Sequence, residues 1–231
     1  MSAMHEYENR DQLAEALASG VAAVLAGAIA MRGEARLAVS GGSTPKRFFG
    51  RLSQTAIDWE KVTITLVDER FVDPDHERSN LRLVREALLQ DKAVKAKLVP
   101  LADGSSDTVE EAAASADHAI AMLGRLDAAI LGMGNDGHTA SFFPEGDRLE
   151  DALDPNCQHH VIAISAPGAG EPRLTLTLHY LLEAHFLALH IEGEEKLQTL
   201  DRARKDGSEL AMPVRAVFRR AADRLQIFWA P

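Results

Sequence analysis

Cysteine is nearly absent from this 231-residue chain, which contains only Cys157. A single thiol cannot build a disulfide framework, so the sequence suits a reducing compartment rather than a disulfide-stapled secreted fold. Basic residues are also scarce, because 25 Lys and Arg stand against 35 Asp and Glu and leave a net charge of −10. That balance argues against a nucleic-acid partner, which requires a basic face.

Long hydrophobic runs are missing as well. No stretch approaches about 18 uninterrupted apolar residues, and the N-terminus lacks the apolar core of a signal peptide. We therefore expect a cytoplasmic protein with no membrane partner. The length fits one α/β domain over residues 1–231, either as a monomer or as a small homo-oligomer.

Two common hydrolase motifs do not occur. Without Gly-x-Ser-x-Gly, a serine mechanism of the α/β-hydrolase type lacks its nucleophile, and no His-Glu-x-x-His zinc motif is present. The nine histidines are scattered without the spacing of a structural zinc site. His118 falls within a predicted helix and His190 within a predicted strand, where we expect packing or surface roles. We predict neither a metal nor a cofactor.

Apolar strands alternate with amphipathic helices along the chain. This alternation predicts a mostly parallel, Rossmann-like α/β sheet with helices on both faces. Loops that follow parallel strands gather at one edge of the sheet, so residues distant in sequence can share a site. The predicted helices cover residues 9–32, 80–88 and 108–123, and the predicted strands cover 36–39, 62–67, 97–100, 127–131, 160–165, 186–191, 213–217 and 225–229. Residues 147–159 are predicted to form a surface loop.

The loop at residues 132–141, Gly-Met-Gly-Asn-Asp-Gly-His-Thr-Ala-Ser, follows a short apolar strand. Its three glycines allow positive φ and a close approach to a ligand. The loop presents Asp136 and His138 at the end of the strand, and we expect Thr139 to cap a short helix that begins there.

Three interpretations of this loop compete. It can be a glycine-rich turn with an incidental histidine. It formally matches the Gly-x-Gly-x-x-Gly dinucleotide fingerprint, but that fingerprint requires a long helix directly afterwards, and Pro144 and Gly146 interrupt the chain. The third interpretation is a general acid/base site, in which His138 titrates near neutrality and Asp136 orients it or the substrate.

A second loop, Ser40-Gly41-Gly42-Ser43-Thr44-Pro45, follows the strand at 36–39. Thr44 is a good N-cap and Pro45 suits the first helical position. Free backbone N–H groups and the helix dipole would together favour a phosphate group here. The loop is not a P-loop, because no Gly-Lys-Ser/Thr follows it.

The sequence from Gly132 to Pro144 resembles the signature of the 6-phosphogluconolactonases, and Asp68-Glu69-Arg70 followed by Ser79-Asn80 resembles their second motif. This family shares its fold with glucosamine-6-phosphate deaminases and ribose-5-phosphate isomerases. The resemblance implies that 6-phospho-D-glucono-1,5-lactone is hydrolysed to 6-phosphogluconate in the oxidative pentose phosphate pathway, with a sugar phosphate lactone as the small-molecule partner. It implies catalysis by His138 and Asp136 through water.

The same resemblance assigns substrate-binding residues. They are Gly41, Gly42, Ser43, Thr44, Asp68, Arg70, Arg173 and Lys196. The cations have simpler alternatives: Arg70 can form a surface ion pair with Glu69 or Glu77, and Lys196 can pair with Glu192 on an exposed helix. Whether Asp68 is catalytic or only binds sugar hydroxyls stays open.

Two other functions remain as alternatives. A glucosamine-6-phosphate deaminase carries Asn-Glu-Pro after the central histidine, whereas this chain has Ser141-Phe142-Phe143-Pro144-Glu145. A non-catalytic sugar-phosphate sensor would retain the pocket beside a helix-turn-helix domain, for which residues 1–33 offer too little length.

Overall fold

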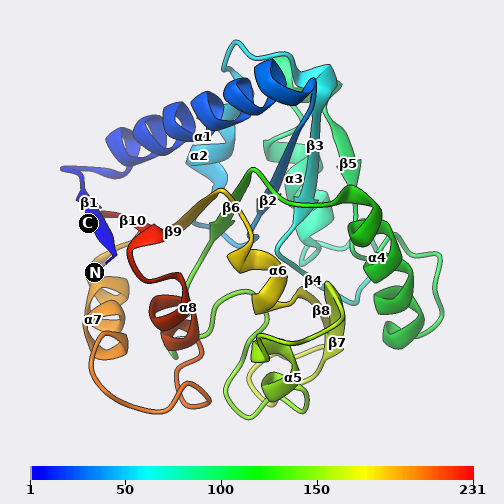
Figure 1. The fold of residues 1–231 in the computed structure, drawn as a ribbon, viewed down its shortest axis with the longest axis vertical. Coiled ribbons are helices and arrows are strands. Elements are labelled where there is room, and N and C mark those ends of the chain that lie inside the picture. Colours follow the sequence, from blue (N-terminus) through cyan, green and yellow to red (C-terminus); the bar gives the residue numbers. More distant parts are fainter. Residues whose placement is uncertain (1) are drawn as a thin grey trace.

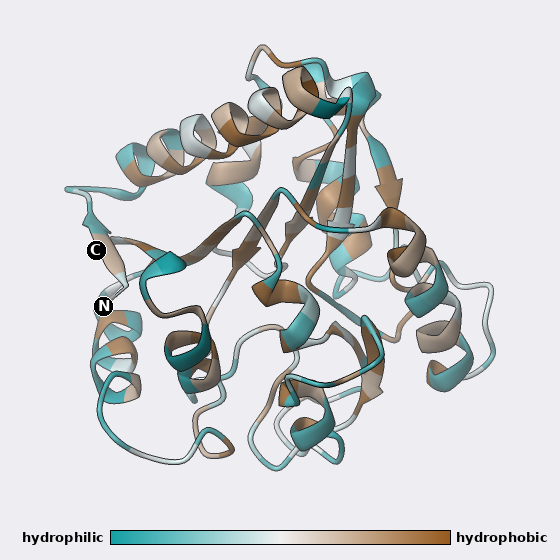
Figure 2. Ribbon diagram, viewed as in Figure 1, coloured by the Kyte–Doolittle hydropathy of each residue, from teal (hydrophilic) through white to brown (hydrophobic). Residues whose placement is uncertain are grey.

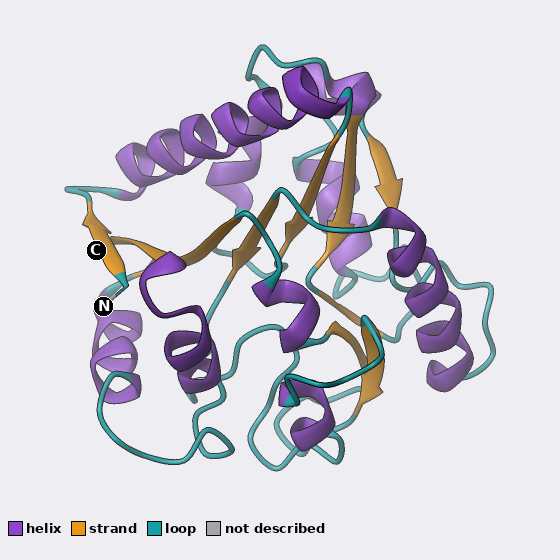
Figure 3. Cartoon of the chain, viewed as in Figure 1, coloured by secondary structure: helices purple, strands orange, loops and turns teal. Residues whose placement is uncertain are grey.

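The computed structural model describes residues 2–231, which form two β-sheets surrounded by helices (Figures 1 and 3). The larger sheet has seven parallel strands in the order β1-β10-β9-β6-β2-β3-β5. Its strands are β1 (Ala3–Glu6), β2 (Ala35–Val39), β3 (Val62–Leu66), β5 (Lys97–Val99), β6 (Ala128–Leu131), β9 (Phe186–Glu192) and β10 (Leu225–Ala230). The helices are α1 (Arg10–Arg32), α2 (Lys46–Ser53), α3 (Asn80–Ala87), α4 (Val109–Leu123), α5 (Leu149–Leu153), α6 (Leu178–Leu182), α7 (Glu194–Ala203) and α8 (Val214–Ala221).

The order of the strands places the helices on two faces. Connections from β2 to β3 and from β3 to β5 run in one direction along the sheet, whereas those from β6 to β9 and from β9 to β10 run in the other. Because parallel crossovers are right-handed, α1, α2 and α3 lie on one face of the sheet, and the helices that follow β5 lie on the opposite side (Figure 1). The direction changes between β2 and β6. The crevice at the carboxyl ends of these strands is where open α/β sheets bind ligands.

A second sheet of three antiparallel strands, in the order β4-β8-β7, lies beside the carboxyl ends of the large one (Figure 3). It consists of β4 (Asp68–Arg70), β7 (Val161–Ile164) and β8 (Arg173–Leu176). β4 follows β3 after a single residue, and Asp68 pairs with Thr175 and Arg70 with Arg173. This register brings two charged segments that lie about a hundred residues apart to one wall of the crevice.

Helix ends follow local sequence signals. The Asn9 side chain accepts a hydrogen bond from Gln12 N, and Gly33 ends α1 in the left-handed region at φ 83°. Thr108 and Glu111 form a capping box at the start of α4. The predicted helices at 9–32, 80–88 and 108–123 are therefore confirmed to within one residue.

Apolar residues concentrate in the sheets and on the inward faces of the helices (Figure 2). By length and composition alone α1 is apolar enough to cross a membrane, although Glu15 and Ser19 interrupt its apolar run. It packs on β2 and β10 of the sheet. Its buried residues recur every three or four positions, as in a core helix of a globular protein; they include Leu13, Leu17, Val21, Leu25 and Ala28.

Several local expectations are wrong. Residues 213–217 start α8 rather than form a strand: the short Val-Arg-Ala-Val pattern suits both periods, and Pro213 occupies the helix N-cap. Residues 147–159 include α5, whose Leu149 and Leu153 are buried. Thr139 caps no helix. Its hydroxyl donates to Gly132 O at 2.7 Å and closes the loop instead.

Candidate active site

A pocket of about 390 Å³ lies at the carboxyl ends of β2, β6 and β9. The pocket lies between β2 and β6, where the connections between strands change direction along the sheet. Loops from both strands therefore reach it. Every predicted site residue except Asp136 lines this pocket, and Asp136 lies directly behind His138. The lining members are Gly41, Gly42, Ser43, Thr44, Asp68, Arg70, His138, Arg173 and Lys196.

His138 and Asp136 form a hydrogen-bonded pair, with 2.6 Å between His138 Nδ1 and Asp136 Oδ1. Asp136 Oδ1 also accepts the His138 backbone N–H at 3.0 Å. Burial by itself would raise the pKa of Asp136, but the bonds and charge of His138 outweigh it and lower the pKa to about 2. A carboxylate only accepts hydrogen bonds, so Nδ1 carries the proton and Nε2 is left as the free base.

The ring of His138 is also held from its face. It stacks on Phe143 with 4.1 Å between ring centroids and 29° between planes. Phe143 is 5% exposed, and the side chain of His138 is 29% exposed. The imidazole is therefore fixed in orientation yet accessible from the pocket.

Gly134 is required by this arrangement. A Cβ at Gly134 would collide with the ring of His138 and lie 2.5 Å from Asp136 Oδ1. Gly137 adopts φ 84°, in the left-handed region that favours glycine. Asn135 O accepts hydrogen bonds from Thr199 and Arg202 of α7 at 3.3 and 3.1 Å, which ties the loop to a helix.

The loop after β2 brings backbone to the opposite side of the pocket. α2 begins at Lys46 with Pro45 as N-cap, one residue later than expected, so Thr44 is a loop residue and not the cap. Gly42 adopts φ 91°. A Cβ at Gly41 would overlap the amide of Asn80, so only glycine allows this approach. The α2 N-terminus and its preceding loop thus present N–H groups toward the pocket.

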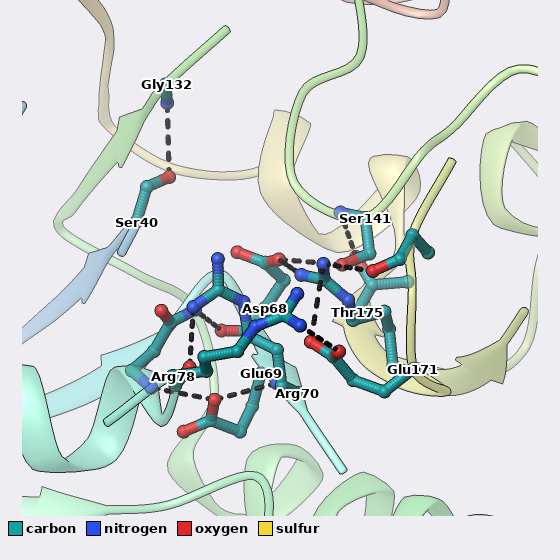
Figure 4. A network of polar contacts seen from close by, with 12 residues as sticks. Ser40, Asp68, Glu69, Arg70, Arg78, Gly132, Ser141, Glu171 and Thr175 are labelled. Carbon is teal, nitrogen blue, oxygen red and sulfur yellow. Dashed lines mark hydrogen bonds and ion pairs between the residues drawn. The ribbon is translucent and has the colours of Figure 1, made fainter. Parts of the chain in front are cut away.

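Asp68 and Glu69 are adjacent carboxylates with different surroundings (Figure 4). Glu69 accepts the backbone N–H groups of Arg70, Asn80 and Leu81 at 2.7, 2.8 and 2.6 Å. Burial raises the pKa of Glu69, and these three bonds oppose the shift. Asp68 lines the pocket instead, where Oδ2 accepts the Ser141 hydroxyl at 2.6 Å. Glu69 is thus a structural anchor for α3, and Asp68 faces the ligand space.

Arg70, Arg78 and Arg173 lie on the same wall of the pocket, and Figure 4 labels the first two. Arg173 is 5% exposed, lies 3.7 Å from Asp68 Oδ2 and donates to Ala169 O at 2.7 Å. Burial lowers the pKa of Arg173, and the charge of Asp68 opposes this. Arg70 donates to Arg78 O at 2.5 Å, and Arg78 pairs with Glu171 at 3.0 Å. The alternative, an ion pair of Arg70 with Glu69 or Glu77, is wrong: within residues 2–231 Arg70 pairs with neither, and Glu69 is occupied by backbone N–H groups.

Lys196 has a different environment. Within residues 2–231 its ammonium forms no ion pair and no hydrogen bond; Glu192 contacts His190 and Arg10 instead. The pairing of Lys196 with Glu192 considered from the sequence is therefore wrong. Burial lowers the pKa of Lys196, and the negative charges of Asp136 and Glu195 oppose the shift. A half-buried ammonium beside the pocket is available for an anion.

Sequence reasoning missed two pocket residues, His190 and Arg78. His190 is buried at 3% exposure and lines the pocket as well. Asn80, which belongs to the second motif, also lines it. A strand histidine carries no local signal for a site. No group of three or more His, Cys, Asp or Glu side chains in residues 2–231 is placed to hold a metal ion.

The fold and the pocket define a class: an α/β protein with a glycine loop at a helix N-terminus, a His–Asp pair and a cluster of cations at the sheet's change of direction. The chain belongs to the glucosamine-6-phosphate isomerase/6-phosphogluconolactonase family, whose model matches residues 8–229. The resemblance and the fold class expected from the sequence are thereby confirmed.

Similar proteins agree with this membership. The chain is 58% identical over 229 residues to a 6-phosphogluconolactonase of Rhizobium meliloti (strain 1021), with 99% of this chain and 98% of the relative covered. A crystal structure of a 6-phosphogluconolactonase from Shewanella baltica OS155 superposes with a TM-score of 0.96 at 39% identity, covering 100% of this chain and 98% of that one. A monomeric glucosamine-6-phosphate deaminase shares the fold, with a TM-score of 0.79 at 16% identity and coverage of 99% and 97%.

Proposed function

We propose that this protein hydrolyses 6-phospho-D-glucono-1,5-lactone to 6-phospho-D-gluconate in the oxidative pentose phosphate pathway. The observation that carries the proposal is the His138–Asp136 pair, which leaves a free imidazole nitrogen beside an anion-binding loop and unpaired Lys196. Relatives named 6-phosphogluconolactonase, similar over nearly the whole chain, support the same activity. We place the protein in the cytoplasm, as a monomer or small homo-oligomer.

In the proposed mechanism His138 Nε2 takes a proton from water as the water oxygen bonds to the lactone carbonyl carbon. Asp136 holds the ring in the required tautomer and stabilises the imidazolium that forms. Arg70 and loop N–H groups stabilise the oxyanion of the tetrahedral intermediate. The intermediate then collapses, the bond to the ring oxygen breaks, and His138 returns its proton to that oxygen. The new carboxylic acid ionises and releases one proton.

The phosphate group would be held where donors outnumber acceptors. Gly41, Gly42, Ser43 and Thr44 offer N–H and hydroxyl groups at the α2 N-terminus, and Lys196 offers an unpaired ammonium. Arg173 adds positive charge from the antiparallel sheet. Ser141 bonds only to Oδ2 of Asp68, so the other carboxylate oxygen would accept hydrogen bonds from sugar hydroxyls.

Acid release from the phosphorylated lactone, measured against the spontaneous rate, tests the proposal. Purified protein should accelerate it, should release no ammonia from glucosamine 6-phosphate, and should retain activity after prolonged chelation. Comparable ammonia release would instead support a deaminase. Loss of activity on chelation, restored by zinc or magnesium, would overturn the metal-free mechanism. The chain lacks the Asn-Glu-Pro of the deaminase motif, which favours the lactonase.

A further inference from the structure

His190 is a buried ionisable group in the pocket that the proposed mechanism does not use. It occupies the carboxyl-terminal part of β9, is 3% exposed and lines the pocket. Its ring meets Phe48 of α2 edge-on, with 6.1 Å between centroids. The small part of this ring that solvent reaches therefore faces the same space as the α2 N-terminus.

Glu192 holds the imidazole. Residues two apart on a strand point to the same face, and Glu192 Oε1 lies 3.2 Å from His190 Nε2. The Glu192 side chain is 7% exposed, and its other oxygen lies 3.5 Å from Nε of Arg10, at the start of α1. Arg10 is fixed in turn, since Nε donates to Pro231 O at 2.9 Å. This chain of contacts supports a buried carboxylate aimed at one nitrogen of the ring.

The tautomer follows from this contact. A carboxylate only accepts, so Nε2 of a neutral imidazole bears the proton and Nδ1 is left with a lone pair. Nδ1 has no hydrogen-bond partner within residues 2–231, yet it is not sealed from solvent as Nε of Arg70 and Nε of Arg173 are. His190 thus offers the pocket a fixed acceptor.

Acceptors are the scarce groups in this pocket. Most of its polar side chains donate, as do the N–H groups of the glycine loops. Apart from hydroxyl oxygens, its other side-chain acceptors are the Asp68 carboxylate, the buried Asn80 Oδ1, which lacks a partner, and His138 Nε2, to which the proposed mechanism assigns water. A sugar lactone presents several hydroxyl donors, and each one that is buried needs an acceptor.

We propose that His190 is a specificity-determining residue, whose Nδ1, oriented by Glu192, accepts a hydrogen bond from a hydroxyl group of the sugar. The inference rests on the proposed function for the kind of substrate. His190 would then discriminate against sugars that lack this hydroxyl, because a site that forms a hydrogen bond to a hydroxyl binds analogues without it poorly.

Two isosteric substitutions separate this role from a structural one. In His190→Asn the side-chain amide reaches about the position of Nδ1 and keeps an acceptor there. In His190→Gln it reaches the position of Nε2, keeping the contact with Glu192 but losing the acceptor in the pocket. His118→Asn, an exposed position on α4, is the matched control.

Binding of 6-phosphogluconate and of its 2-, 3- and 4-deoxy analogues is measured by calorimetry. We expect His190→Gln to weaken binding of 6-phosphogluconate about tenfold, His190→Asn to weaken it less, and the control to match the wild type. One deoxy analogue should bind equally to wild type and His190→Gln. A greater loss in His190→Asn than in His190→Gln, or equal losses for every analogue, would overturn the proposal.

A measurement on unaltered protein guards against misfolding of the variants. With ¹⁵N-labelled histidine, 6-phosphogluconate should shift the His190 Nδ1 resonance and leave Nε2 nearly unchanged. An unmoved Nδ1 would overturn the inference. Neither measurement needs turnover, so a wild-type protein that binds the sugar as predicted but leaves the lactone decay rate unchanged would contradict the proposed function alone.

Discussion

The pocket has two unlike walls. The first, which we call the glycine wall, comes from the loops after β2 and β6 and from Lys196 of α7. The second, the arginine wall, comes from the antiparallel sheet and nearby loops and contains Asp68, Arg70, Arg78, Glu171 and Arg173. On the glycine wall His138 and Lys196 keep an unpaired nitrogen toward the pocket. On the arginine wall charges are extensively paired with one another or with backbone.

This difference separates two tasks. Unpaired groups can exchange protons with a substrate or bind it directly, whereas paired groups hold a fixed positive field and need no reorganisation during a reaction. Substitution of His138 or Lys196 on the glycine wall should therefore change activity and leave the fold intact. A substitution on the arginine wall, or in its support, should change both. The following experiments test that division, from the largest expected effect to the smallest.

Removal of the proposed base is expected to have the largest effect. His138→Ala should lower kcat by about 10²–10⁴, which corresponds to about 3–5 kcal/mol in activation free energy. Steady-state rates corrected for spontaneous hydrolysis measure this. The melting temperature and the affinity for 6-phosphogluconate should change little, and His118→Ala is the control. A folded His138→Ala protein with near-wild-type kcat would transfer the role to Asp68 or Asp136.

Removal of the carboxylate beneath the arginine wall should unfold the site. Glu69→Ala leaves the buried backbone N–H groups of Asn80 and Leu81 and the half-buried one of Arg70 without an acceptor, and each costs about 1 kcal/mol or more. We expect at least about 3 kcal/mol lower free energy of unfolding by urea denaturation. Glu69→Gln, which keeps one acceptor oxygen, should lose less, and exposed Glu77→Ala should lose almost nothing. A Glu69→Ala protein as stable as the Glu77→Ala protein would show that Glu69 does not anchor α3.

Lys196 and Arg173, the two cations proposed to bind the phosphate, should respond differently to substitution. Lys196→Ala should raise KM about ten- to a hundredfold and leave the melting temperature unchanged, because its ammonium has no protein partner to lose. Arg173→Ala should raise KM and also lower the melting temperature, because Asp68 and Ala169 O lose a partner. With unphosphorylated gluconolactone the increase in KM caused by Lys196→Ala should nearly vanish. Equal penalties on both lactones would mean that Lys196 does not bind the phosphate.

The smallest effect concerns pH. Because the pKa of Asp136 falls from 3.8 to about 2 in the folded protein, its stabilisation is present above pH 4 and is lost as the pH falls toward 2. The shift corresponds to about 2 kcal/mol, which we reduce to about 1 because the side chain is 46% exposed. The difference in free energy of unfolding between wild type and Asp136→Asn should shrink over that range. A difference that stays constant from pH 6 to pH 2 would exclude this linkage.

Local sequence signals predicted much of the fold and the two glycine loops of the pocket, whereas the family resemblance pointed to Asp68, Arg70, Arg173 and Lys196, which line the same pocket. Caps at Asn9 and Thr108, the stop at Gly33 and the glycines of the 132–141 loop act over a few residues, so they can be read from sequence. For short segments the prediction was wrong where the hydrophobic pattern fits the period of a helix and the period of a strand equally well. Residues 213–217 alternate like a strand, but Pro213 and the packing of α8 against β10 make them helical.

By itself, the sequence determined the alternation of strands and helices, the two glycine loops and the presence of His138 next to Asp136. Only the tertiary structure decided which charged residues are free. Asp68 and Glu69 carry the same functional group, yet successive residues of a strand face opposite sides, so Glu69 meets the α3 backbone and Asp68 meets the pocket. His190 joined the site because β9 lies beside β6 in the sheet, a pairing between segments more than fifty residues apart that no local pattern encodes.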